Sequence, residues 1–438
     1  MNIKNSFKHR IIALVFLSSL VVFSRCKKDS LEETQIDAPQ SEVLTDSATV
    51  TSGNAEAAST PASTEVPQTT PATAASPVAT PAGSEPSSTS GSAGDVRSKG
   101  IAASGITSSS YYLEKSLPSG YVKDGSKDYT SYVQAAVSRY SNIVFPAFPI
   151  LVNDKGINIA SNKVITFLPG SQVLLKGSSK AAYNIFNISG ASNITLYNPV
   201  IVGDRSSHTS KGGEAGMGIA IRGSNNVTLY NAQISNCWGD GIYIGQTNSK
   251  VISKNIVIKD ATLRKNRRDG ISIIAVDGLL MDNVYAGFSD GTAPMCGINF
   301  EPNNPACEIK NVRINNPKTE ANENGIQVGT KRMIGSSNKN TDITITNHVD
   351  EGSTRYAVKL MCNPSTSGKQ NGLVNIINPT WNRSKLNIPL YLNTNQANFK
   401  TAVSSPAVTN TSGTVLPYAA VYTMLMTKAS SSKLTVTN

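Results

Sequence analysis

The chain has 438 residues, of which 39% are apolar, 16% are charged and 6% are aromatic. Only three of them are histidines, which argues against multi-histidine metal sites and histidine-relay enzymes. Residues 1–105 carry 8 of the 40 basic and 10 of the 29 acidic side chains, so residues 106–438 carry 32 minus 19, or +13. We therefore expect carboxylates, Arg, Lys and Tyr to carry the chemistry, within the basic second part of the chain.

Residues 1–25 have the layout of an export signal. Basic side chains precede an apolar run from Ile11 to Phe23, which is short for a membrane span. Cys26 follows this run, and the arrangement resembles the signal of bacterial lipoproteins, in which that cysteine is lipidated. The resemblance implies an exported protein held at the outer membrane or cell surface by a lipid on Cys26. Arg25 departs from the usual small residue, which leaves an uncleaved anchor or a secreted form as alternatives.

Residues 26–105 predict a disordered tether. From about residue 36 the segment consists almost entirely of Ser, Thr, Ala, Pro, Gly and Glu, without aromatic residues or apolar periodicity. Such a composition buries too little apolar surface to offset the entropy lost on ordering. We expect its prolines to stiffen it as a spacer, so that residues 106–438 form the folded domain.

A repeat of short strands dominates that domain. Glycines followed by alternating apolar residues recur at intervals of 23, 29, 27 and 28 residues, and a second series of strands starts with asparagine. A unit of roughly 28 residues is too short for a propeller blade and leaves no room for a helix, so it predicts one coil of a parallel β-helix. We expect the asparagines to sit in corners with left-handed backbone. The two series are Gly218, Gly241, Gly270, Gly297 and Gly325, and Asn193, Asn226, Asn255 and Asn311.

The ends of the domain give weaker signals. Residues 128–140 place Val133, Val137 and Tyr140 at helical spacing, which predicts a helix capping the N-terminal end. The repeat signal fades after 343–345, although 419–422 and 434–436 are further strand candidates.

Segments 124–130, 134–137 and 143–146 resemble the entry region of the pectate-lyase-like superfamily. The resemblance implies an all-β fold, a single-stranded right-handed parallel β-helix. It does not fix the reaction, because that superfamily includes hydrolases, lyases, epimerases, phage tailspikes and nonenzymatic adhesins.

Alignment of the glycines predicts a site. The residues before them form a column that places Asp240 and Asp269 on adjacent coils, and Glu301 lies on the outward face of the same strands. Tyr and Trp side chains beside these carboxylates suit a sugar chain, because aromatic faces stack on pyranose rings. The expected substrate-binding residues are Arg222, Trp238, Tyr243, Arg267, Arg268, Asn299 and Gln327, overhung by loop residues Glu214 and His208.

Glycoside hydrolysis needs two carboxyl groups in different protonation states. We expect adjacent Arg267 and Arg268 to hold Asp269 ionised as the base, and either Asp240 or Glu301, whichever is more buried, to be the acid. The motif at 239–245 resembles the strand bearing the first catalytic Asp of family 28 glycoside hydrolases, and Asp240 matches that Asp. The family's Asp-Asp, Gly-His-Gly and Arg-Ile-Lys segments are missing, which puts its specificity and its inverting outcome in doubt.

Other interpretations remain open. A lyase would bind calcium through Asp240, Asp269 and Glu301 and use Arg267 or Arg268 as the base, whereas the hydrolase needs no cofactor. A third hypothesis is a noncatalytic adhesin, and an Asp before Gly also caps turns in purely structural roles. The charge of +13 favours an anionic polysaccharide as partner, whereas scattered basic residues disfavour nucleic acid. We expect a monomer.

Four cysteines besides Cys26 allow two disulfides without requiring any. Cys296 and Cys307 flank one loop and are a candidate pair, with stacking in the interior as the alternative.

Overall fold

The computed structural model describes residues 105–382, 388–427 and 433–438. The leader, Cys26 and the tether up to residue 104 lie outside the described residues. No helix in these described ranges is long and apolar enough to cross a membrane.

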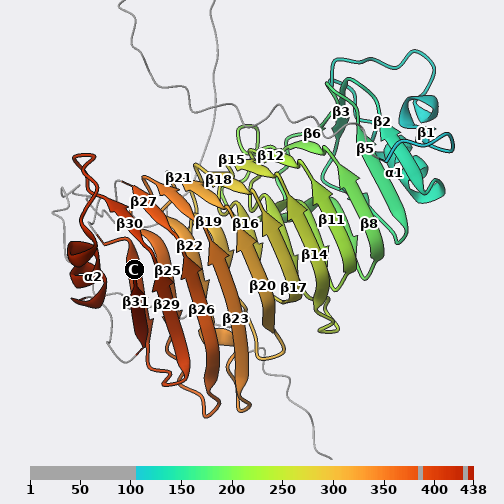
Figure 1. Ribbon diagram of the computed structural model, residues 1–438. Helices are drawn as coiled ribbons and strands as arrows, with labels where there is room; N and C mark the ends of the chain where they lie inside the picture. The colour runs from blue at the N-terminus through green and yellow to red at the C-terminus, as the bar shows by residue number, and fades with distance from the viewer. Residues whose placement is uncertain (1–104, 383–387, 428–432) are drawn as a thin grey trace, which may run out of the picture. The chain divides into compact units, whose positions relative to one another are not determined.

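The described residues fold as a right-handed parallel β-helix. The repeat predicts the parallel β-helix, and the resemblance to the pectate-lyase-like superfamily implies its hand. Most coils contribute one short strand to each of three sheets, and neighbouring strands in a sheet pair in parallel. Figure 1 shows the coils following one another in sequence order, from β5 and β8 at the green end to β29 and β31 at the red end.

The first sheet has 12 strands within the described residues. They are β1 (Tyr111–Tyr112), β2 (Asn142–Phe145), β5 (Lys163–Phe167), β8 (Ser192–Tyr197), β11 (Asn225–Tyr230), β14 (Ser253–Lys259), β17 (Val276–Asp282), β20 (Ile309–Asn315), β23 (Lys339–Thr346), β26 (Gln370–Ile377), β29 (Phe399–Ser404) and β31 (Leu434–Thr437).

The second sheet has 10 strands in the same part of the chain, most of them only three residues long. They are β3 (Pro149–Val152), β6 (Gln172–Leu175), β9 (Val200–Val202), β12 (Gln233–Ser235), β15 (Thr262–Arg264), β18 (Tyr285–Gly287), β21 (Lys318–Glu320), β24 (Val349–Glu351), β27 (Thr380–Asn382) and β30 (Ala407–Thr409).

The third sheet, with 9 strands among the described residues, carries the glycine motifs and is called the site sheet below. Its strands are β4 (Ile157–Asn158), β7 (Ala182–Ser189), β10 (Ala215–Arg222), β13 (Ile242–Gly245), β16 (Ile271–Ile273), β19 (Cys296–Phe300), β22 (Asn324–Gly329), β25 (Tyr356–Cys362) and β28 (Leu390–Thr394).

The period in the sequence has a packing cause. Ile219, Ile242, Ile271 and Ile298 occupy one register position on successive coils and are fully buried, so they form a column in the core. The glycine before each of them approaches the backbone of the next coil. A Cβ at Gly270, for example, would lie 2.5 Å from the carbonyl oxygen of Gly297. Any larger residue would push the coils apart, and glycine therefore recurs once per coil.

The asparagines lie in corners, as expected. Asn193, Asn226, Asn255 and Asn311 all have positive φ, between 50° and 59°. The amide of Asn226 donates to Asn193 at 3.1 Å, and that of Asn255 donates to Asn226 at 3.2 Å. Amide stacking between coils thus compensates for a backbone conformation that most residues avoid.

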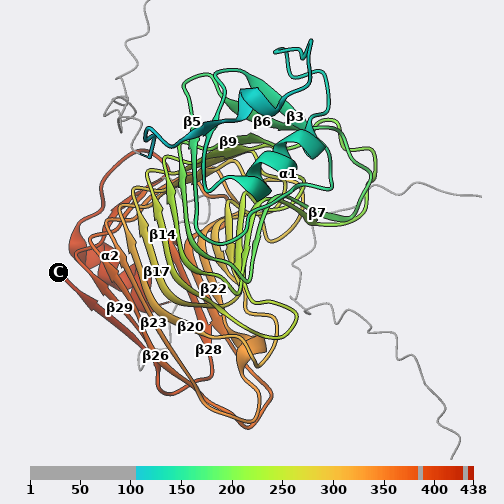
Figure 2. The same cartoon turned by 90° about the vertical axis from the view of Figure 1, so that its right-hand side faces the viewer.

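Helix α1 (Thr130–Arg139) forms within the predicted range, with Val133 and Val137 buried. Figure 2 looks onto the N-terminal end and shows α1 crossing it, in contact with β4. The described residues also contain two short 3-10 helices, η2 (Leu113–Ser116) and η3 (Lys331–Met333).

The coils continue beyond the point at which the repeat signal fades, since β25 to β30 extend all three sheets up to Thr409. One expectation for the C-terminal part is wrong. Residues 419–422 belong to helix α2 (Tyr418–Thr427), which buries Val421 and Leu425, and not to a strand. The strand expected at 434–436 is present as β31.

The four cysteines of the described domain are free and buried. The disulfide considered between Cys296 and Cys307 is therefore not formed, and the alternative of interior stacking holds. Both side chains lie at 0% exposure.

Candidate active site

The glycine alignment correctly places Asp240 and Asp269 on adjacent coils. The N–H of Gly241 donates to the carbonyl of Asp269 at 3.0 Å, and the N–H of Asp269 donates to the carboxylate of Asp240 at 3.2 Å. Each aspartate immediately precedes the glycine that leads into its strand, β13 or β16. The two carboxylates therefore meet because of the register between the coils.

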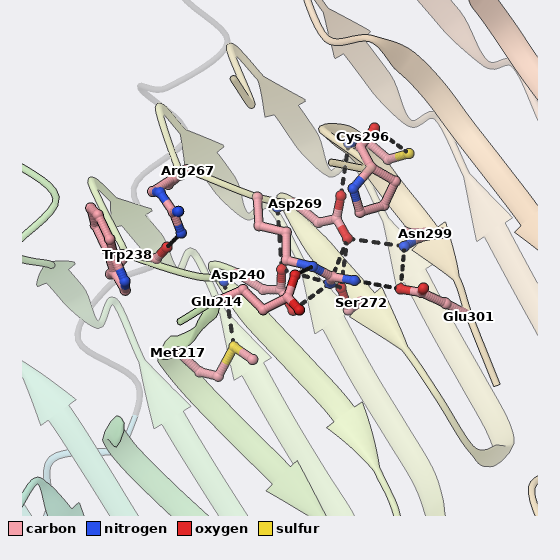
Figure 3. Close-up of polar contacts among 12 residues, drawn as sticks. Glu214, Met217, Trp238, Asp240, Arg267, Asp269, Ser272, Cys296, Asn299 and Glu301 are labelled. Carbon is pink, nitrogen blue, oxygen red and sulfur yellow. Dashed lines mark hydrogen bonds and ion pairs between the residues drawn. The ribbon is translucent and has the colours of Figure 1, made fainter. Parts of the chain in front are cut away.

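The Arg268 guanidinium lies between three carboxylates, those of Asp240, Asp269 and Glu301. Figure 3 shows these three acidic side chains close together. Its Nη1 contacts Asp240 at 3.2 Å and Asp269 at 3.0 Å, while Nη2 contacts Glu301 at 2.5 Å. A fourth carboxylate, that of Glu214, lies 3.5 Å from Nε. One cation thus faces four acidic groups, and the cluster is negative overall if all of them are ionised.

Neutral donors complete the surroundings of Asp269. Its carboxylate accepts hydrogen bonds from the Ser272 hydroxyl at 2.9 Å, the Cys296 N–H at 2.8 Å and the Asn299 amide at 3.0 Å. The same Asn299 amide donates to Glu301 at 3.2 Å, and the Gln327 amide donates to Asn299 at 3.1 Å. A continuous polar network therefore runs from Asp269 across β16 and β19 to β22.

Burial sets the protonation of this cluster. Asp240 and Asp269 are at 0% exposure. Burial raises the pKa of Asp240, and burial together with the charge of Asp240 raises the pKa of Asp269 to about 7. Burial alone would lower the pKa of Arg268, but the carboxylates of Asp240, Asp269 and Glu301 raise it above its usual value. Asp269 therefore titrates near neutrality while Arg268 stays charged.

These findings correct the expectation that flanking arginines hold Asp269 ionised. Arg268 does contact Asp269, but Arg267 points away and donates to the carbonyl of Gly213 at 2.9 Å. The attraction of one arginine does not outweigh burial and the neighbouring carboxyl. Between the two acid candidates, Asp240 is the more buried, because the Glu301 side chain is 32% exposed.

A second group of predicted residues forms a stack beside the cluster. The Trp238 ring is covered on one side by the Arg267 guanidinium, 3.8 Å from its centroid, and it stacks with the His208 ring at 3.9 Å. His208 is fixed through Nδ1, 2.8 Å from the Asp204 carboxylate, which also accepts from the Tyr183 hydroxyl. Trp238 is largely covered by these partners and belongs to the packing of this group.

The remaining predicted residues lie on the same sheet. The Arg222 guanidinium stacks over the Tyr243 ring at 4.4 Å and donates to Asn184 at 3.3 Å. Tyr243 occupies the same outward row as Ser272, Asn299 and Gln327. Among the described residues no hydrogen bond or ion pair joins Arg222 or Tyr243 to the three carboxylates, although the charge of Asp240 acts on both.

The outward row is not the open patch that the alternation of the strands suggests. Ser272 and Asn299 are fully buried and Gln327 is 6% exposed. In the charged cluster, the side chains that reach solvent are those of Glu214, which is 47% exposed, Glu301, which is 32% exposed, and Arg268, which is 12% exposed. A cavity of about 250 Å³ at the N-terminal end, beside Tyr112 and Phe148, contains none of the predicted site residues.

The sequence missed part of the site. Ser272 stands in the outward row but carries no signal beyond its position, and the Cys296 N–H is a backbone group that no motif marks. Within the described residues, no group of three or more His, Cys, Asp and Glu side chains is arranged to hold a metal ion. Arg268 occupies the space between Asp240, Asp269 and Glu301, so calcium would bind those three only after Arg268 moved away.

No family model matches the chain. It is similar to two Bacillus subtilis proteins, the uncharacterized protein YclG, at 29% identity over 213 residues, and the SPbeta prophage-derived uncharacterized protein YorA, at 30% over 162 residues. The matches cover 42% and 33% of this chain but only 36% and 28% of those proteins, so the chain spans about a third of their length.

Three solved structures with low sequence identity are similar in fold. An iota-carrageenase of family GH82 from A. fortis is 14% identical, covers 62% of this chain and 71% of its own, and has a TM-score of 0.49. The A-module of the Azotobacter vinelandii mannuronan C-5 epimerase AlgE6 is 15% identical, with coverages of 68% and 87% and a TM-score of 0.47.

The third is the tailspike gp49 of Acinetobacter baumannii bacteriophage Fri1, a capsular polysaccharide depolymerase. It is 12% identical, covers 76% of this chain and 63% of its own, and has a TM-score of 0.47. At these identities the likeness concerns the fold alone.

Proposed function

We propose that this protein is a glycoside hydrolase that cleaves a polysaccharide, with Asp240 and Asp269 as its acid and base pair. The observation that carries the proposal is the buried pair of carboxyl groups on one guanidinium, of which Asp269 has a pKa of about 7. Acid and base catalysis needs a group that gains and loses a proton near the working pH. A carboxyl with that pKa meets this condition, whereas an ordinary exposed aspartate does not.

The accessible carboxylates mark the approach of the substrate. Glu214 and Glu301 face solvent on either side of Arg268, whose side chain covers the two aspartates. A sugar that hydrogen-bonds Arg268 and Glu301 would compete with the ion pairs that hold the guanidinium in place. In this proposal, substrate binding draws Arg268 aside and brings Asp240 and Asp269 to the glycosidic bond.

Hydrolysis fits the geometry better than elimination does. A lyase needs an arginine that accepts a proton, but the three carboxylates raise the pKa of Arg268, and Arg267 is turned toward Gly213. The calcium alternative needs Arg268 to move aside, as the hydrolase does, so this requirement does not separate the two schemes. A binding-only adhesin is tested by the same experiment as the hydrolase. The proposal also includes export and a lipid anchor at Cys26.

The test is a cleavage screen of the purified full-length chain on uronate-containing and sulfated polysaccharides. New reducing ends without unsaturated products would support hydrolysis, and calcium-dependent unsaturated products would select the lyase. We expect Asp240→Asn and Asp269→Asn each to lower the rate about 100-fold or more. The matched control is Asp342→Asn, because Asp342 is exposed on β23 of another sheet.

The outcome that would contradict the site is full activity in both aspartate variants. Polysaccharide binding without any cleavage by the parent would instead identify a binding protein. The control variant should cleave as well as the parent, which separates loss of a carboxylate at the site from loss of a negative charge anywhere.

A further inference from the structure

Lys359 continues the outward row of the site sheet. Ser272, Asn299, Gln327 and Lys359 are register partners on β16, β19, β22 and β25. The residues on either side of Lys359 are Val358 and Leu360, which pair with core positions of β22 and are fully buried. Because side chains alternate along a strand, Lys359 points to the same face as the carboxylate cluster.

The burial of Lys359 is unusual for its chemistry. The residue is only 7% exposed, and no hydrogen bond or ion pair of its ammonium is found among the described residues. Lys163, the other buried lysine in that part of the chain, is 5% exposed but donates to the carbonyls of Tyr140 at 2.7 Å and Ser138 at 3.3 Å. The Nζ atom of Lys359 is not among the fully buried atoms without a partner in the described residues, so a ligand can reach it from solvent. An ammonium on a largely covered side chain without a partner costs free energy, and an anionic ligand would offset that cost.

The neighbours of Lys359 suit a sugar. Tyr391 is its register partner on β28, and the ring of Tyr391 lies 4.9 Å from that of Tyr356 at the start of β25. Aromatic rings beside a charged group are a common platform for pyranose faces. On the other side, Gln327 links this region to Asn299 and the carboxylate cluster. The arrangement places a cation, two aromatic rings and the candidate active site on one sheet.

We propose that Lys359 binds an anionic substituent of the polysaccharide, a carboxylate or a sulfate, at a subsite separate from the site of cleavage. The inference rests on the proposed function and defines its substrate as anionic. Lys359 lies three strands beyond Ser272, which is about 14 Å at the usual strand spacing. The charged sugar it binds is therefore a different unit from the one whose bond is cut.

This separation resolves a conflict of charge. Four carboxylates and one arginine at the cluster repel an anionic group placed directly on them. Lys359 lies two strands beyond β19, which ends beside Glu301, so an anion bound at Lys359 avoids direct contact with the carboxylates. An anionic chain is then held by one unit while another unit reaches the acid and base.

The experiment measures binding and thermal unfolding of the full-length chain and its Lys359→Met variant. The probes are polygalacturonate against its methyl ester, and dextran sulfate against dextran, which separate carboxylate from sulfate recognition. Lys254→Met is the matched control, since Lys254 is exposed on β14 of another sheet and its loss changes the net charge equally.

We expect Lys359→Met to weaken binding of one anionic polymer about 30-fold or more, as for loss of one partner of a buried charge pair. Binding of the matched neutral polymer should not change, and Lys254→Met should bind like the parent. Without ligand, Lys359→Met should unfold at a higher temperature than the parent, because a largely covered and unpaired charge has been removed.

Equal binding of every probe by the parent and Lys359→Met would overturn the subsite. A lower unfolding temperature of the ligand-free variant would also overturn it, since Lys359 would then have a structural partner. The binding assay tests the subsite and the cleavage assay tests the hydrolase, so the failure of one proposal can be told from the failure of the other. Lys359-dependent binding without cleavage would keep the subsite and refute the hydrolase, whereas cleavage unaffected by Lys359→Met would refute the subsite alone.

Discussion

Replacement of Asp269 by asparagine should change how the stability of the protein depends on pH. The pKa of Asp269 rises from 3.8 to about 7 on folding, with burial as the main cause. A carboxyl with a raised folded pKa favours folding when protonated. Its contribution is complete below about pH 3.8 and is lost as the pH rises through about 7.

The size of the effect follows from the linkage between protonation and folding. Each pH unit between the two pKa values costs the parent about 1.4 kcal/mol, so Asp269 removes about 3 kcal/mol of stability between pH 5 and pH 7. The asparagine side chain of the variant does not titrate, and the loss of the neighbouring charge also lowers the pKa of Asp240. The free energy of unfolding of Asp269→Asn should therefore fall much less over this range.

The asparagine has a cost of its own. Asp269 accepts from Ser272, Cys296 and Asn299, and an amide offers one acceptor oxygen where the carboxylate offers two. We expect Asp269→Asn to be less stable than the parent at pH 5 by about 1–3 kcal/mol, the cost of buried groups left unpaired. At pH 8 the difference should vanish or change sign.

Urea unfolding of the parent, Asp269→Asn and the exposed control Asp342→Asn at several values from pH 5 to pH 8 measures this directly. The free energy of unfolding of the control should change with pH by the same amount as that of the parent. If the free energy of unfolding of Asp269→Asn instead differed from that of the parent by a constant amount at every pH, Asp269 would titrate normally and its place in the acid and base pair would lose its support.

Two further predictions concern the interior. The buried Asp350 accepts from Thr319 and Ser353, and burial raises its pKa to about 6, so Asp350→Asn should gain about 3 kcal/mol of stability relative to the parent between pH 4 and pH 7.5. Urea titrations at the two pH values measure the difference, and an equal effect at both would contradict it. The four buried cysteines of the domain should resist a thiol reagent at pH 8 in the folded state and all react after unfolding; two fewer thiols after unfolding without reductant would indicate a disulfide.

The sequence predicts the coil and its register because both depend on short-range packing. A Cβ at Gly270 would meet the carbonyl of Gly297, so the glycine spacing directly records how coils stack. The column of Asp240 and Asp269 follows from that stacking alone. The left-handed corners at the asparagines were predicted for the same reason, since few other residues adopt that backbone conformation at low cost.

The tertiary structure decides what the long side chains do. Arg267 and Arg268 are neighbours in sequence, yet one stacks on Trp238 and the other joins three carboxylates, because consecutive residues at the start of a coil point in different directions. The sequence could not show that this arginine covers the aspartates and leaves them buried. Their raised pKa values depend on that burial.

The place of Lys359 in the site sheet also could not be predicted from the sequence. The coil of β25 lacks the glycine motif, with Tyr-Ala-Val-Lys in its place, so the period gave no sign that a lysine joins the outward row. Only the pairing of β25 with β22 places Lys359 beside Gln327. Only the packing around Lys359 reveals that its side chain is largely covered. The sequence by itself thus determines the spacing of the coils, while the charge and accessibility of the site depend on side chains that meet across several coils.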